Sequence, residues 1–227
     1  MTQTTFDQWL ARERREHPAV GVLWDAVMGH PGLSAMAPSL AQAYEAIARS
    51  LAQGGTLYLC GNGGSYSDAL HISGEMLKAF VLPRPVPADL AERLASQPDG
   101  ADLVRHLQTG LRAHVLGANQ ALATAVANDI PVPDIGYAQE LYALARPGDV
   151  LLGISTSGRA RNVRLAAQVA AAVGLTTIAL TGRAPNPLAD SVDIALAVPE
   201  RETYRAQELH LALYHQLCLM LEARFFG

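Results

Sequence analysis

Two polar side chains on one predicted helix have the types and spacing that acid–base or metal chemistry requires. His71 and Glu75 stand four residues apart in a segment, about 65–80, whose apolar residues recur at helical spacing. Residues four apart are neighbours on one helix face. An imidazole beside a carboxylate can transfer protons or bind a metal ion. The same spacing also fits a solvated polar face with helical charge pairs, so the pair alone leaves both interpretations open.

A second pair lies near the end of the chain. The segment 203–225 is apolar nearly all round, which predicts a helix buried in the core or in a subunit interface. Gln207 and His215 are eight residues apart there, about 80° apart around the axis at 3.6 residues per turn, so both could approach one point. The alternative is an exposed polar stripe, because Glu208, His215 and Glu222 follow heptad spacing.

The loop Ser155-Thr156-Ser157-Gly158 has the composition of an anion-binding site. It follows the apolar run 149–154, a predicted strand, and precedes a predicted helix over about 159–173. Backbone N–H groups and the dipole at a helix N-terminus favour a negative charge. A plain helix cap needs one hydroxyl, whereas this loop offers three. We therefore expect the loop to hold a phosphate.

A similar loop, Gly61-Asn62-Gly63-Gly64-Ser65, follows the predicted strand 56–60. It is not the dinucleotide pattern, because Tyr66 stands where that pattern has glycine, and no Gly-Lys-Ser/Thr follows as in a P-loop. The loop either binds an anion as the Ser155–Gly158 loop is expected to do, or is a tight turn.

The elements that position these residues alternate between apolar strands and helices. Further strands are predicted over about 113–116, 175–181 and 191–198, and a helix is predicted to about residue 127. All-apolar strands alternating with helices predict a parallel sheet with helices on both faces, an α/β fold of three layers. We expect a helical N-terminal extension over residues 1–32. The main domain then covers 33–227, with a proline-rich insertion over about 81–111 that carries one or two short helices.

Composition narrows the class of protein. The net charge is −4, which argues against a nucleic-acid binder. No basic and apolar leader opens the sequence, and the apolar stretches are too short or interrupted to span a bilayer. The two cysteines, Cys60 and Cys218, lie in apolar runs and are expected to be buried free thiols. These features favour a cytoplasmic protein that binds neither nucleic acid nor membrane.

Taken together, the motifs resemble the phosphoheptose isomerase family, whose members have the SIS fold and convert sedoheptulose 7-phosphate to a glycero-manno-heptose 7-phosphate. The resemblance runs in order over about 33–225, apart from the insertion. The motifs that carry it are Cys60-Gly-Asn-Gly-Gly-Ser65, His71-x3-Glu75, Asn128-Asp129, Gly153-Ile-Ser-Thr-Ser-Gly158, Asn162-Val163, Ile178-Ala-Leu-Thr-Gly182 and Gln207-Glu208-x-His210-x4-His215.

The resemblance implies a role for each matching position. Substrate contacts are implied for Asn62, Gly63, Gly64, Ser65, Glu75, Asn128, Asp129 and Gln207, and phosphate contacts for Ser155, Thr156 and Ser157. One zinc ion per subunit is implied at His71, Glu75, Gln207 and His215, with Glu75 and His215 as the catalytic acid–base pair. Members of the family are usually homotetramers with sites at subunit interfaces, which suits the apolar last helix.

The sequence also departs from the family pattern. Ala160 replaces a serine that normally helps to hold the phosphate, and the flanking Arg159 and Arg161 could compensate. Tyr66 stands where a histidine is more usual, and the insertion lengthens the chain after the His71/Glu75 helix. Two alternatives stay open: another SIS enzyme with a different sugar phosphate, or a SIS protein without turnover that binds sugar phosphates or associates with the bacterial replication initiator.

Overall fold

The computed structural model describes residues 1–227 and contains one sheet of five parallel strands, in the order β2-β1-β3-β4-β5. The strands are β1 (Leu57–Cys60), β2 (Ala113–Val115), β3 (Val150–Ser155), β4 (Thr176–Thr181) and β5 (Ile194–Ala197). The predicted parallel α/β architecture is therefore confirmed. Because all strands run the same way, the loops that follow them meet at one end of the sheet.

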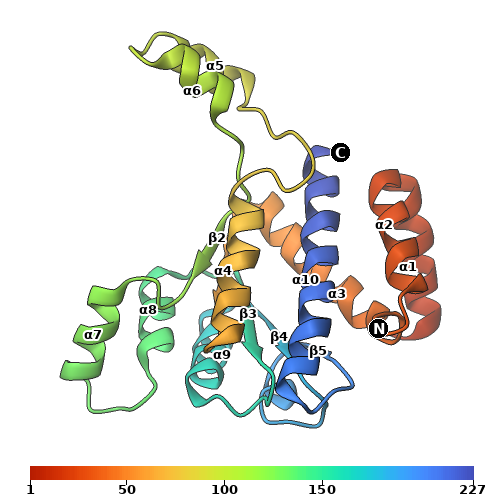
Figure 1. Cartoon of the computed structure of the whole chain (residues 1–227), viewed down its shortest axis with the longest axis vertical. Coiled ribbons are helices and arrows are strands. Elements are labelled where there is room, and N and C mark those ends of the chain that lie inside the picture. The colour runs from red at the N-terminus through yellow and green to blue at the C-terminus, as the bar shows by residue number, and fades with distance from the viewer.

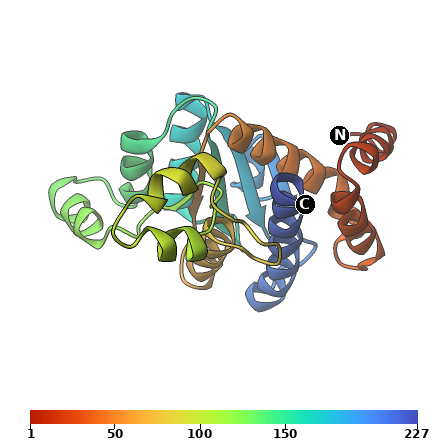
Figure 2. The same ribbon diagram turned by 90° about the horizontal axis from the view of Figure 1, so that it is seen from above.

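Helices cover both faces of the sheet, as Figures 1 and 2 show. Successive residues of a strand point to opposite faces, so Leu57 and Leu59 join one buried cluster and Tyr58 and Cys60 join another. The first cluster includes α3 (Ala37–Ala52), α4 (Gly64–Leu77) and α10 (Thr203–Phe226); the second includes α8 (Gly136–Leu144) and α9 (Arg161–Val173). Helix α7 (Gln120–Asp129) lies to one side, and short 3₁₀ turns occupy Ser34–Met36 and Ala189–Ser191.

Helices α4 and α10 run side by side in the same direction. His71 meets Tyr214 near the middle of both helices, and the chain just after α4 meets Glu222 near the end of α10. This parallel pairing brings the two polar pairs that the sequence singles out onto neighbouring helices.

The N-terminal residues form two helices, α1 (Gln3–Glu16) and α2 (Pro18–Gly29), which lie beside α3 and α10 (Figure 2). Phe6, Trp9, Trp24 and Tyr44 pack together there at ring-centroid distances of 5.1–6.0 Å; Phe6 and Trp9 are stacked, and the other pairs meet edge to face. Because these rings belong to the same buried cluster as the sheet, the helices share the core of the rest of the chain. The division of the chain at residue 32 stays a prediction.

The proline-rich insertion forms an arm that carries α5 (Ala88–Ala95) and α6 (Gly100–His106). Figure 1 shows the arm projecting from the end of the molecule opposite the loops that follow β1 and β3. Two hydrogen bonds close its base, from Thr109 N to Arg84 O at 2.7 Å and from Thr109 Oγ1 to Pro85 O at 2.8 Å. The arm therefore lies far from the predicted phosphate loop of its own protomer.

A buried ion pair holds the base of the arm on α10. Glu222 accepts hydrogen bonds from the backbone N–H groups of 80–82 and from Arg84 Nε at 2.8 Å, and both side chains are only 1% exposed. Arg84 also donates to the carbonyls of Glu75 and Met76 at the end of α4. The interpretation of Glu222 as part of an exposed stripe is therefore wrong, because its carboxylate satisfies backbone donors inside the fold.

None of the helices combines the length and apolarity that a bilayer crossing requires. Both cysteines are buried free thiols, as predicted, and burial raises the pKa of Cys60 and of Cys218 to about 12. At neutral pH both therefore stay protonated and unreactive.

Candidate active site

The two middle turns of α4 and α10 bring three predicted site residues together. His71 Nε2 lies 3.2 Å from Glu75 Oε1, and the rings of His71 and His215 lie 5.0 Å apart between centroids. The His71 side chain is 42% exposed and that of Glu75 15% exposed, so the cluster opens to solvent on one side. Burial first, and the neighbouring His71 second, lower the pKa of His215, which keeps its imidazole neutral at pH 7.

A hydrogen-bonded chain behind this cluster fixes the orientation of His71. Tyr214 donates its hydroxyl proton to Asp68 Oδ1 at 3.3 Å, and the same hydroxyl lies 3.0 Å from His71 Nδ1. Because that proton is used, the hydroxyl oxygen accepts from His71 Nδ1–H, and the other ring nitrogen, Nε2, faces Glu75. Sequence reasoning missed Tyr214, because nothing distinguishes it among the apolar residues of the last helix.

The cluster has the chemistry of a cation site. An imidazole nitrogen and a carboxylate oxygen 3.2 Å apart attract each other only when a proton or a metal ion lies between them. Glu75 Oε2 and His215 Nε2 are buried and make no hydrogen bond, although Lys78 Nζ lies 3.7 Å from Glu75 Oε2 in an ion pair. Two imidazoles and one carboxylate are ordinary zinc ligands by type, but the ligand atoms of His71, Glu75 and His215 do not all lie within 4.8 Å of one another.

Gln207, the fourth predicted ligand, lies elsewhere in the protomer. Its amide occupies the space that a Cβ on Gly64 would fill, at the first turn of α4. Eight residues separate it from His215, which is about 12 Å of helix at about 1.5 Å per residue. Gln207 is therefore placed against the glycine loop and not beside the histidines.

The loop after β1 is joined to the first turn of α9. Asn62 and Asn162 exchange two amide hydrogen bonds of 2.8 and 2.9 Å, and the Tyr137 hydroxyl donates to Gly61 O. Asn62 and Gly63 line a cavity of about 380 Å³ beside α7 and α8, whereas Ser65 is buried. Of the predicted substrate residues in this loop, Asn62 and Gly63 thus line the cavity, while Gly64 is exposed outside it.

The loop after β3 borders a second cavity. Thr156 and Ser157 line it, while Ser155 is buried and its carbonyl accepts from the Thr181 hydroxyl at 2.7 Å. Gly158 has a φ of 63°, a left-handed conformation that favours glycine. Two of the three predicted phosphate hydroxyls therefore face the same cavity.

Asn128 and Asp129 are not brought to this region. They end α7, both are exposed, and the side-chain hydrogen bond that they make joins them to each other at 2.8 Å. Neither lines the two cavities beside the strand loops.

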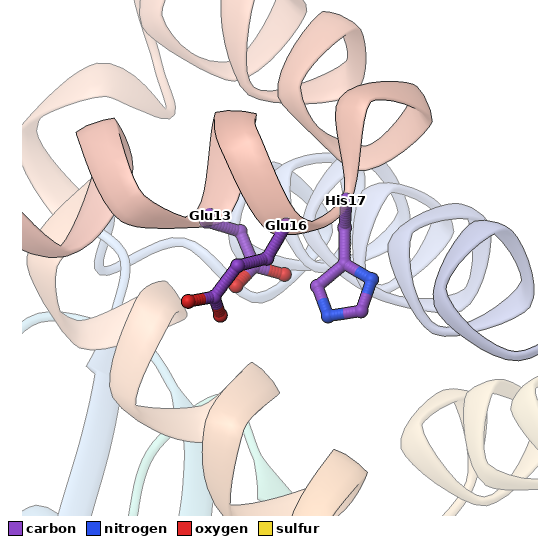
Figure 3. Close-up of side chains that lie close together, drawn as sticks. All are labelled: Glu13, Glu16 and His17. Atoms are coloured by element: carbon purple, nitrogen blue, oxygen red, sulfur yellow. The ribbon is translucent and has the colours of Figure 1, made fainter.

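A different group of possible metal ligands lies on the N-terminal helices. Figure 3 shows Glu13, Glu16 and His17, whose ligand atoms lie within 4.8 Å of one another. Glu13 is already satisfied, because it accepts from the Tyr44 hydroxyl at 2.6 Å and from Arg224 at 3.2 Å. The Arg224 guanidinium also places a positive charge at the carboxylate, which opposes a cation there. We assign Glu13 to the packing of α1 on α3 and α10.

The chain has many similar proteins in sequence. Two family models described as SIS domain match residues 32–105 and 125–221. The phosphoheptose isomerase of Thiobacillus denitrificans is 36% identical over 217 residues, which are 90% of this chain and 98% of that protein. The phosphoheptose isomerase of Thermodesulfovibrio yellowstonii is 39% identical over 182 residues, 80% of this chain and 78% of that protein.

Solved structures agree with these relatives. Phosphoheptose isomerase GmhA from Neisseria gonorrhoeae superposes with a TM-score of 0.65 at 28% identity, over 95% of this chain and 98% of that one. A phosphoheptose isomerase from Francisella tularensis gives a TM-score of 0.67 at 27% identity, over 97% of this chain and 98% of that one. The likeness extends over nearly the whole length of each chain.

Proposed function

Since the chain belongs to the phosphoheptose isomerase family of SIS-domain proteins, we propose that it converts sedoheptulose 7-phosphate to a glycero-manno-heptose 7-phosphate. The relatives and the fold make it a sugar-phosphate isomerase. The observation that carries the proposal is the His71–Glu75–His215 cluster on α4 and α10. Within it, His215 Nε2 is buried without a hydrogen bond, as a reactive or metal-binding site requires.

Aldose–ketose isomerisation moves a proton between two adjacent carbons through an enediol. It needs a base for the carbon-bound proton and a group that stabilises the developing oxyanion. Glu75 is the base in this proposal and His215 the partner acid, although the two roles are interchangeable. A neutral His215 can donate an N–H to the oxyanion without the cost of a buried charge, and its lowered pKa supports that state.

We extend the proposal to zinc, held by His71, Glu75 and His215. Gln207 would join them only if its side chain moved away from Gly64, or if the Gln207 of a second subunit reached the site. When bound, zinc supplies a Lewis acid that polarises the sugar oxygens. Neighbouring residues hold the cluster in place: the Tyr214–His71 contact fixes one imidazole, and the hydrogen bonds that Arg84 donates to the end of α4 hold the turn that carries Glu75.

We also propose a homotetramer in the cytoplasm. Leu70 and Leu77 on α4 and Leu211 on α10 are 41–51% exposed on the helices that carry the cluster. Burying such apolar side chains between copies would stabilise an assembly and exclude water from the site.

Incubation with sedoheptulose 7-phosphate, followed by NMR of the sugar protons, tests the reaction. We expect heptose 7-phosphate signals to appear. No conversion, with or without added zinc, would contradict the proposal. If other sugar phosphates then reacted, the substrate assignment would be wrong; if the protein only bound them, the non-catalytic alternative would hold.

A further inference from the structure

The cavity beside Thr156 and Ser157 contains more positive charge than the helix N-terminus supplies. It measures about 460 Å³ and lies between the loop after β3 and the loops after β4 and β5. Its polar lining includes three arginines, Arg159, Arg183 and Arg201, and one acid, Glu200. The cavity therefore joins the predicted phosphate hydroxyls to a cluster of guanidinium groups.

These arginines are free to bind a ligand. None of the three guanidinium groups takes part in an ion pair or a side-chain hydrogen bond, and Glu200 likewise pairs with no cation. Arg161 differs, because its guanidinium donates to Pro133 O and lies 3.6 Å from Asp134. Of the two arginines that flank Ala160, only Arg159 is thus available to compensate for the missing serine hydroxyl.

Backbone hydrogen bonds fix the walls that carry the arginines. Gly182 N donates to Thr156 O at 3.0 Å, and Arg183 N donates to Glu200 O at 2.8 Å. These two bonds tie the three strand loops to one another. The cationic residues are therefore presented by a connected frame and not by separate loose segments.

A buried amide completes that frame. Asn186 accepts from Ala189 N at 3.0 Å and donates to Gly182 O at 3.3 Å. Its side chain fills the space that a Cβ on Gly158 would occupy, so the loop after β4 packs directly on the phosphate loop.

We propose that Arg159, Arg183 and Arg201, which line the cavity beside the predicted phosphate loop, bind the phosphate dianion of the substrate and select it by charge. The inference deepens the proposed function and rests on it for the identity of the ester. Guanidinium groups suit a phosphate because their N–H fork binds two oxygens at once, and charge-assisted hydrogen bonds are stronger than those from hydroxyls. Because Ala160 has no hydroxyl, the arginines supply the phosphate contacts that a serine at this position would otherwise make.

The test measures the binding of inorganic phosphate by calorimetry at low salt, because this readout does not depend on turnover. Wild type is compared with Arg183→Gln, Arg201→Gln and the double variant. Arg105→Gln on α6 is the control, since it removes the same charge from the arm at the other end of the molecule. Thermal unfolding verifies that each variant folds.

Each cavity variant is expected to weaken phosphate binding about tenfold, the double variant more, and the control less than about twofold. In the isomerase assay the same variants should raise KM and leave kcat within a few-fold. Unchanged phosphate affinity in the double variant, or no measurable binding by wild type, would overturn the inference. Arginine-dependent phosphate binding without conversion of sedoheptulose 7-phosphate would instead leave it standing and refute the proposed reaction.

Discussion

Replacing Glu222 with Gln should destabilise the fold more than any exposed charge change. Its carboxylate accepts three backbone N–H groups of 80–82 and pairs with Arg84, and both side chains are 1% exposed. An amide has one acceptor oxygen instead of two and no negative charge. The variant therefore leaves the Arg84 guanidinium buried without its counter-charge.

The expected cost follows from that burial. Removing one partner of a buried ion pair costs about 3–5 kcal/mol. For a chain of 227 residues each kcal/mol lowers the melting temperature by about 2–4 °C, so the midpoint should fall by about 6–20 °C. Adding Arg84→Met removes the orphaned charge, so the double variant should be less destabilised than the sum of the two single changes.

Urea unfolding followed by circular dichroism measures these costs. Asp89→Asn is the matched control, because it makes the same change in an exposed pair with Arg93 and should cost less than about 1 kcal/mol. A loss below about 1 kcal/mol in Glu222→Gln, or strict additivity with Arg84→Met, would refute the reasoning.

Acid titration provides a second readout of the same pair. Burial alone would raise the pKa of Glu222, but its backbone N–H donors and Arg84 together outweigh that effect and lower the pKa. The stabilisation from the carboxylate is thus present above the usual carboxyl pKa and lost as the pH falls through the lower folded value. Glu222→Gln should lack this component of acid denaturation; an unaltered acid profile would contradict the assignment.

Three further predictions concern the core, the phosphate loop and the metal. Burial lowers the pKa of His210 from 6.5 to about 4, so the free energy of unfolding should fall by about 3 kcal/mol as the pH drops through that interval. Urea unfolding midpoints measured against pH, for the wild type and for His210→Gln, check this. The same pH dependence in both proteins would contradict it. Gly158→Ala should lower the free energy of unfolding by about 1–3 kcal/mol, because the new Cβ meets Asn186 Oδ1 and the residue has a positive φ. Thermal unfolding measures this loss, and a variant as stable as the wild type would refute the packing. Chelation should abolish turnover without unfolding, and zinc should restore it; full activity in metal-free protein would exclude the zinc proposal.

Local pattern was enough to predict the parts of the fold that depend on neighbours in sequence. The apolar runs that end in glycine and serine loops become β1 and β3, and helices follow both. The four-residue spacing of His71 and Glu75 predicts a contact that the structure places at 3.2 Å. Such features need no knowledge of the rest of the chain.

Features that depend on packing between distant segments could not be predicted from the sequence. The partners of Glu222 are backbone N–H groups about 140 residues earlier, which no spacing rule reveals. Helix α8 is short and lies between proline-containing segments, so its hydrophobic periodicity is weak. Helix α2 could have been located from the sequence, because Pro18 stands at its first turn. The angle between Gln207 and His215 around the axis of α10 suggested that both could approach one point. The distance along the axis was not considered, and it leaves Gln207 beside Gly64.

Turnover of sedoheptulose 7-phosphate in D₂O tests the central claim most directly. The account predicts that the wild type forms heptose 7-phosphate with deuterium at C2, because the proton that Glu75 removes exchanges with solvent before it returns. Glu75→Gln, folded and with wild-type phosphate affinity, should form product at a rate lower by orders of magnitude. Full activity in that variant, or no product from the wild type, would contradict the account.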